Sequence, residues 1–154
     1  QTCSLPIFNT GIIRNPSFIN DIAIKYGAQA VVCSIEAKRS GVNKWECYVE
    51  NGREPTGRDV MDWMSEAQER GVGEFLITSV DQEGTKRGFD IELYKLARKI
   101  SRVPIIASGG AGKIDHIKQV YQEAGVQAVA VASLLHYNLA TVKQIKESLG
   151  ISQQ

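Results

Sequence analysis

Short apolar runs alternate with amphipathic helical patterns along most of the chain. The runs cover residues 30–35, 74–80, 103–107 and 128–132, and a shorter run covers residues 5–8. Between them, apolar residues recur three and four positions apart, which predicts helices over residues 16–26, 60–70, 90–100, 115–124 and 141–149. This alternation is typical of βαβ units, so the sequence predicts a parallel sheet flanked by helices in one α/β domain over residues 1–154.

The longest interval between two predicted strands follows the run at 30–35. It contains Trp45, Cys47 and Val49 in alternation with polar residues, and then Asn51-Gly52. An Asn-Gly pair beside alternating apolar residues is a strong hairpin signal. We therefore predict a β-hairpin insertion over residues 40–56, which could serve either as a plain surface loop or as a lid over a substrate.

Charge and composition narrow the possible functions. Of the 154 residues, 43% are hydrophobic, and the net charge of +1 gives no electrostatic reason to expect nucleic acid or an anionic membrane surface as a partner. No apolar run approaches the length of a membrane span. The three cysteines have no metal-type spacing, so we expect free thiols in a reducing cytoplasm and no metal. We also expect no cofactor, since the glycines at 108–112 lack the spacing of a dinucleotide-binding loop.

Small and hydroxylated residues follow the predicted strands, at the edge where parallel α/β folds place their reactive groups. The apolar run at 103–107 leads into Ser108-Gly109-Gly110, and the run at 128–132 leads into Ser133. Glycines expose backbone N–H groups to which an anion can come close. In a (βα)8 barrel, the loops after the seventh and eighth strands commonly bind phosphate, and the sequence thus predicts a phosphorylated ligand.

Carboxylates supply the candidate proton-transfer groups. Glu36 interrupts an apolar strand and is a candidate general acid or base, although an ion pair with Lys38 or with a neighbouring lysine is an equally weighted interpretation. Asp81 is a second candidate, or it braces the turn at Gly84-Thr85. The hydroxyl groups of Thr78, Thr85, Ser108 and Ser133 suit phosphate oxygens.

Three motifs in order resemble the cyclase subunit of imidazole glycerol phosphate synthase. They are the stretches 35–39 (IEAKR), 78–90 (TSVDQEGTKRGFD) and 105–113 (IIASGGAGK), and Asn9-Thr10 resembles a further pair in that family. The resemblance implies a (βα)8 barrel of the TIM-barrel type, of which this chain would be the C-terminal half, strands five to eight with a remnant of strand four.

The resemblance also implies a function and site residues. The family takes ammonia from a glutaminase subunit and uses it on a substrate with two phosphates, forming imidazole glycerol phosphate and an aminoimidazole carboxamide ribotide in histidine biosynthesis. Glu36 would stand at a catalytic position. The positions near the two phosphates would be Asn9, Thr10, Thr78, Gly84, Ser108, Gly109, Gly110, Ala132 and Ser133.

Two departures from the family pattern leave alternatives open. Glu36 and Glu83 stand where the family has aspartates, and an added methylene displaces a carboxylate. The chain could therefore belong to an ammonia-using branch that amidates nucleotide sugars for surface polysaccharides, or it could be a non-catalytic phosphate-binding half-barrel. A flavodoxin-like domain is the third possibility. A half-barrel has unpaired strand edges, so we also expect a homodimer.

Overall fold

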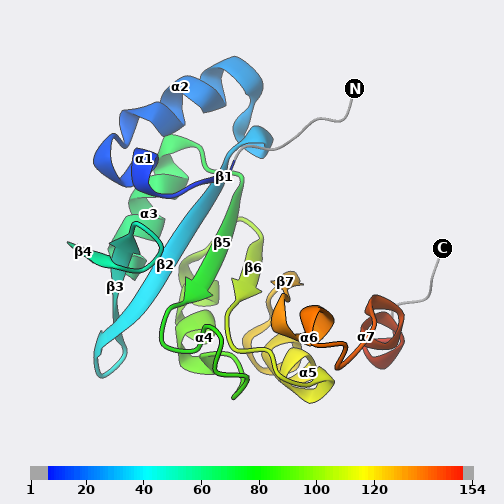
Figure 1. Ribbon diagram of the computed structural model, residues 1–154. Helices are drawn as coiled ribbons and strands as arrows, with labels where there is room; N and C mark the ends of the chain where they lie inside the picture. The colour runs from blue at the N-terminus through cyan, green and yellow to red at the C-terminus, as the bar shows by residue number, and fades with distance from the viewer. Residues whose placement is uncertain (1–6, 151–154) are drawn as a thin grey trace.

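The computed structural model describes residues 7–150, and the predicted N-terminal run at 5–8 therefore lies partly outside the described residues, as does Cys3 (Figure 1). One seven-stranded sheet forms the centre of the molecule. Its strands are β1 (Ile7–Phe8), β2 (Val32–Gly41), β3 (Lys44–Val49), β4 (Glu54–Asp59), β5 (Glu74–Ser79), β6 (Ile105–Ser108) and β7 (Ala128–Ala130).

The parallel strands lie side by side in the order in which they occur in the chain. β1 pairs with β2, β2 with β5, β5 with β6, and β6 with β7, all in parallel. A flavodoxin-like sheet reverses its strand order at a switch point, whereas this order never reverses. The progression in one direction is that of a (βα) barrel segment, and it removes the flavodoxin-like alternative.

Helices connect the parallel strands and pack against one another in sequence (Figure 1). They are α1 (Thr10–Arg14), α2 (Ser17–Tyr26), α3 (Val60–Arg70), α4 (Ile91–Ile100), α5 (Ile114–Ala124), α6 (Ser133–His136) and α7 (Val142–Ser148), with a 3₁₀ turn at Ala28–Ala30. None of the described helices is long and apolar enough to cross a membrane.

The sheet has one buried face and one partly open face. Ile35, Ile77 and Ala107 lie in register on the buried face and have no exposed surface. Because side chains alternate along a strand, Ser34, Leu76 and their neighbours point the other way. That second face is only half-buried, so the strands are not enclosed on both sides as their apolar sequences suggest.

Strand boundaries differ from the predicted ones for local reasons. β2 continues to Gly41, because its last residues pair with β3 rather than entering a loop. β6 begins only at Ile105, after Pro104, which has no N–H for the ladder. β7 ends at Ala130, and Ala132 has helical backbone angles just before α6. The short helix α1, directly after β1, was not predicted.

The predicted insertion at 40–56 is part of an antiparallel meander formed by β2, β3 and β4. β3 pairs with the end of β2 and then with β4, and the turn between β3 and β4 contains Asn51-Gly52. Glu50, Asn51 and Gly52 all have positive φ, at 53°, 59° and 71°. Such a left-handed run is uncommon outside glycine and makes the turn tight. β4 covers Glu54–Asp59 and therefore extends beyond the expected insertion.

Candidate functional site

One row of side chains crosses the open face at the carboxyl ends of the parallel strands. The register places Glu36 opposite Thr78, Thr78 opposite Ser108, and Ser108 opposite Ala130. Neighbouring strands in a sheet lie about 4.8 Å apart, which sets the spacing along the row. A carboxylate and two hydroxyl groups from residues far apart in the sequence therefore face the same space.

A cavity of about 150 Å³ lies at the β7 end of this row. It is lined by Glu83, Ser108, Gly109, Gly110, Ala111, Ala130, Val131, Ala132 and Ser133. Gly109 and Gly110 are buried, yet their N–H groups donate no hydrogen bond to any residue between 7 and 150. Buried N–H groups in native proteins are almost always paired, so this pair is suited to a bound acceptor such as an anion.

Glycine is required at both positions of the cavity wall. Gly109 and Gly110 have φ values of 96° and 99°, which other residues rarely adopt. A Cβ atom on Gly110 would collide with the carbonyl oxygen of Gly88, and one on Gly109 would lie 2.8 Å from the carbonyl oxygen of Ser79. The Gly88 N–H also donates to the Gly110 carbonyl at 2.8 Å, so two loops meet closely here.

The loop from β5 to α4 brings the Glu83 carboxylate to the cavity, whereas the Asp81 carboxylate contacts β2. Glu83 lines the cavity, and Gly84 follows with φ 73° and open space beside it. Asp81 instead accepts a hydrogen bond from the Arg39 N–H at 2.7 Å. Thr85 donates to the Gln82 carbonyl at 2.8 Å. The hydroxyl of Thr85 and the carboxylate of Asp81 therefore support the loop in this structure.

Glu36 lies at the opposite end of the row, under the β3–β4 turn. Its Oε2 accepts a hydrogen bond from the Gly52 N–H at 2.9 Å. Among the described residues Glu36 forms no ion pair, and the Lys38 ammonium lies 5.1 Å from the centre of the Tyr48 ring instead. The carboxylate thus remains available to a molecule that lies on the open face.

Asn9 and Thr10 lie near one edge of the parallel sheet, and the cavity lined by Gly109 and Gly110, here called the glycine cavity, lies near the other edge. Asn9 follows β1, while the cavity lies beyond β6 and β7. The Asn9 side chain donates to the Tyr48 carbonyl at 3.4 Å, and its Oδ1 is buried without a partner among the described residues. Glu36 lies on β2, between these two regions. The structure therefore separates the candidate phosphate residues into two groups with Glu36 between them.

His116 and Tyr94 support the strand ends, and the sequence pattern did not indicate either role. His116 Nδ1 accepts a hydrogen bond from the Gly112 N–H at 3.2 Å, and burial, followed by the charge of Lys113, lowers its pKa. The Tyr94 hydroxyl lies 2.6 Å from the Ser108 carbonyl, and burial raises its pKa well above the usual range. A tyrosine on the buried face of an amphipathic helix gives no sequence signal for such a contact.

The described residues include no cluster of three or more side chains suited to hold a metal ion. The fold and the loops define a class of protein: a (βα) barrel segment whose strand-end loops line a small cavity. The α/β fold class expected from the sequence is confirmed. The family model described as "Histidine biosynthesis protein" matches residues 2–141, and the chain belongs to this family of TIM barrels.

Several curated relatives carry the name imidazole glycerol phosphate synthase subunit HisF. The protein from Metallosphaera sedula is 43% identical over 141 residues, which are 92% of this chain and 56% of the relative. The proteins from Dictyoglomus thermophilum and Streptococcus sanguinis are 42% and 38% identical over the same shares. The resemblance inferred from the motifs is confirmed, and the chain spans about half the length of the relatives it matches.

Proposed function

We propose that this chain is the C-terminal half of an ammonia-dependent cyclase barrel that binds a phosphorylated ribotide in histidine biosynthesis. The observation that carries the proposal is the pair of N–H groups at the buried residues Gly109 and Gly110, which have no hydrogen-bond partner among residues 7–150 and line a cavity beside the hydroxyl-bearing residues Ser108 and Ser133. The lining of this small space thus offers two N–H groups and two hydroxyl groups, which would suit a phosphate group, since its oxygens accept hydrogen bonds from all sides.

The row across the sheet supports the roles proposed for the remaining residues. A ribotide with one phosphate in the glycine cavity and the other near Asn9 and Thr10 would extend over Thr78 and Glu36. Glu36 then transfers a proton at the reacting centre, with the Gly52 N–H holding one of its oxygens. The ammonia would come from a glutaminase partner, which the word "subunit" in the relatives' names supports.

Glu83 is the one carboxylate that lines the glycine cavity. A phosphate dianion there is repelled by an ionised neighbour, so the side chain must turn toward solvent when phosphate is bound. The exposed position of Glu83 permits this movement. We therefore expect the Glu83 carboxylate to weaken phosphate binding rather than to strengthen it.

The longer carboxylates favour one second candidate. Glu36 and Glu83 each carry one methylene more than aspartate, and catalysis is sensitive to displacements of about 1 Å. An ammonia-using barrel that amidates nucleotide sugars would keep the phosphate cavity and the ammonia supply but present a different reacting carbon. A half-barrel that binds phosphate without turnover would share only the cavity.

Reconstitution separates these functions. The chain is co-expressed with the N-terminal half of the Dictyoglomus thermophilum relative, and formation of imidazole glycerol phosphate is followed with ammonium as the nitrogen donor. The proposal expects ammonium-dependent product and loss of it in Glu36→Gln. Ammonium-dependent turnover of a nucleotide sugar alone would instead favour the second candidate. Tight phosphate binding without any turnover would identify a binding module.

A further inference from the structure

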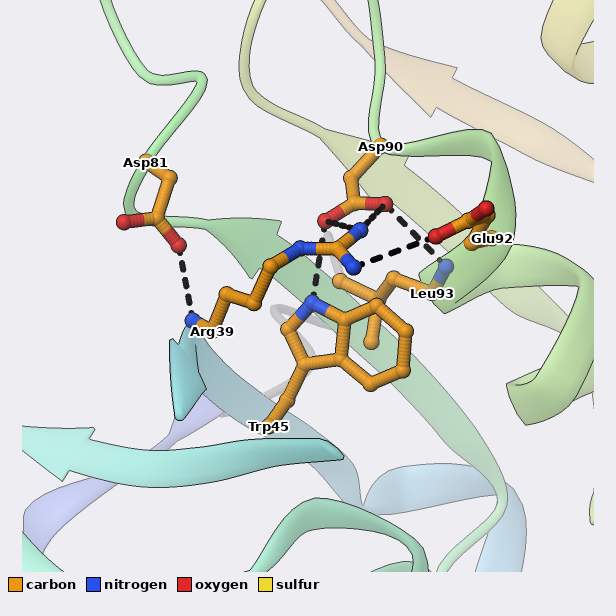
Figure 2. Close-up of polar contacts among 6 residues, drawn as sticks. All are labelled: Arg39, Trp45, Asp81, Asp90, Glu92 and Leu93. Carbon is orange, nitrogen blue, oxygen red and sulfur yellow. Dashed lines mark hydrogen bonds and ion pairs between the residues drawn. The ribbon is translucent and has the colours of Figure 1, made fainter. Parts of the chain in front are cut away.

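Arg39, near the end of β2, contacts both ends of the loop that joins β5 to α4 (Figure 2). Its backbone N–H donates to Asp81 Oδ2 at 2.7 Å, where the loop begins. Its guanidinium donates to both oxygens of Asp90, at 2.9 and 3.2 Å, where the loop ends. A second nitrogen of the guanidinium reaches Glu92 at 3.1 Å. One residue therefore fixes the two points between which Glu83, Gly84 and Thr85 are held.

Buried partners hold the Arg39–Asp90 pair in place. The Asp90 side chain is only 6% exposed, and it also accepts hydrogen bonds from Trp45 Nε1 at 2.9 Å and from the Leu93 N–H at 3.2 Å. The guanidinium carbon of Arg39 lies 4.6 Å from the centre of the Trp45 ring (Figure 2). A buried carboxylate with this many donors has one strongly preferred position, since moving it leaves charges and donors unpaired.

The same loop also contacts Gly110 in the wall of the glycine cavity. Gly88, two residues before Asp90, donates its N–H to the Gly110 carbonyl at 2.8 Å. The two backbones approach so closely that no side chain fits on Gly110. A shift of Asp90 would therefore move Gly88, and with it the Gly110–Ala111 peptide whose carbonyl Gly88 holds; both Gly110 and Ala111 line the cavity.

We propose that Arg39 is a positioning residue that sets the geometry of the glycine cavity through the loop over residues 81–90. None of its hydrogen bonds with the described residues involves a residue of the cavity lining, and it acts through Asp90 and Gly88. The inference rests on the proposed function in one respect, namely that the anion is a phosphate. The planar fork of arginine is essential, because a lysine offers a single charged point that reaches either Asp90 or Glu92.

The test compares Arg39→Met and Arg39→Lys with Arg53→Met in the full 154-residue chain. Arg53 is an exposed arginine in the β3–β4 turn and forms no ion pair with the described residues, so it is the matched control. Amide hydrogen exchange is measured at Gly88, whose N–H reports the contact with Gly110, and at the core amides of α3. Inorganic phosphate is titrated against the same samples by NMR.

In both Arg39 variants, exchange at Gly88 should accelerate and phosphate affinity should fall, each by about tenfold or more, because the loss of a single charge-assisted hydrogen bond already has an effect of about that size. Exchange in α3 should stay unchanged, and Arg53→Met should behave as the parent. Asp81→Asn, which loosens one end of the loop only, should accelerate Gly88 exchange less and serves if the Arg39 variants do not fold.

Unchanged Gly88 exchange in the Arg39 variants, or acceleration spread equally over α3 and the loop, would overturn the positioning role. If the parent chain itself binds no phosphate, the proposed function fails, while the exchange at Gly88 still decides whether Arg39 positions the loop.

Discussion

The Glu36 carboxylate accepts a hydrogen bond from the Gly52 N–H at 2.9 Å, which fastens the β3–β4 turn at the carboxyl end of the parallel part of β2. The turn also packs closely on Val80, the residue that follows β5, since a Cβ atom on Gly52 would lie 3.1 Å from its methyl groups. The candidate proton-transfer group and the turn beside the open face are therefore one structural unit. A change at either residue affects the other, which decides how Glu36 is best tested.

Glu36→Gln should abolish proton transfer while it keeps an oxygen for the Gly52 N–H. In a reconstituted barrel we expect kcat to fall by about 10²- to 10⁴-fold with little change in KM, the usual loss for a general acid or base. Steady-state kinetics measure both constants, and Glu50→Gln, a carboxylate in the same turn, is the control. Parent-like turnover in Glu36→Gln would leave Glu36 with only a structural role. Glu36→Asp should raise cyclase activity if the family's aspartate chemistry is retained.

Gly110→Ala and Gly125→Ala separate backbone strain from loss of the cavity. Both glycines have positive φ, but a Cβ on Gly125 meets nothing within 4 Å, whereas one on Gly110 collides with Gly88. Gly125→Ala should lower the free energy of unfolding by about 1 kcal/mol and leave phosphate binding intact. Gly110→Ala should cost about 3 kcal/mol and abolish phosphate binding. Chemical denaturation and phosphate titration measure the two effects; equal losses in both variants would refute the close contact of the two loops.

Glu83→Gln should tighten the binding of inorganic phosphate. The carboxylate lines the cavity and repels a dianion, while its exposure to solvent weakens the repulsion. We expect affinity to rise several-fold at low salt and the gain to shrink as salt is added. Glu69→Gln, an exposed carboxylate on α3, is the control. Weaker phosphate binding in Glu83→Gln would show that Glu83 supports the bound anion.

The pKa of His116 should lie below the ordinary value of 6.5, because burial and the charge of Lys113 disfavour its protonated form. The unfolded chain then binds more protons than the folded one just below pH 6.5. The stability contributed by neutral His116 is present above that pH and is lost as the pH falls through the folded pKa. Protonation also removes the acceptor of the Gly112 N–H, so the Gly112 amide signal should titrate together with the His116 ring in NMR spectra. A His116 pKa at or above 6.5 would contradict this contact.

The parallel sheet ends in two open edges, which should drive association of the isolated chain. At one edge Ile7 of β1 is 58% exposed, and at the other Ala128 and Ala130 of β7 are exposed. Unpaired edges and exposed apolar surface promote pairing, and closure of a barrel takes about eight strands. We predict a homodimer joined at the edges near residues 5–8 and 128–132. Light scattering after size exclusion should give twice the mass of the chain; a stable monomer at micromolar concentration would refute it.

Much of the fold follows from hydrophobic periodicity alone. Runs such as 74–80 and 103–107 and the amphipathic pattern at 90–100 each correspond to an observed strand or helix within a few residues. The extension of β2 to Gly41 was missed, because its end is polar and is stabilised by pairing with β3 rather than by burial. Long-range pairing of this kind leaves no periodic signal.

The candidate site was predictable in composition but not in arrangement. Glycines after an apolar run indicated an anion at Gly109 and Gly110, yet nothing local to the sequence sets Glu36 opposite Thr78. That relationship depends on the register of strands about forty residues apart, which only the whole sheet determines. The roles of Gly88 and Arg39 were missed for the same reason, since both act through contacts distant in the sequence.

Phosphate titration of the isotope-labelled chain, followed at the backbone amides, would show directly whether the glycine cavity binds phosphate. We expect saturable shifts at the Gly109 and Gly110 amides and at Ser133, with the Gly125 amide unaffected. We also expect Gly110→Ala to abolish the shifts and Gly125→Ala to preserve them. Absence of saturable shifts at Gly109 and Gly110, or equal shifts at Gly125, would contradict the assignment of this cavity to a phosphate group.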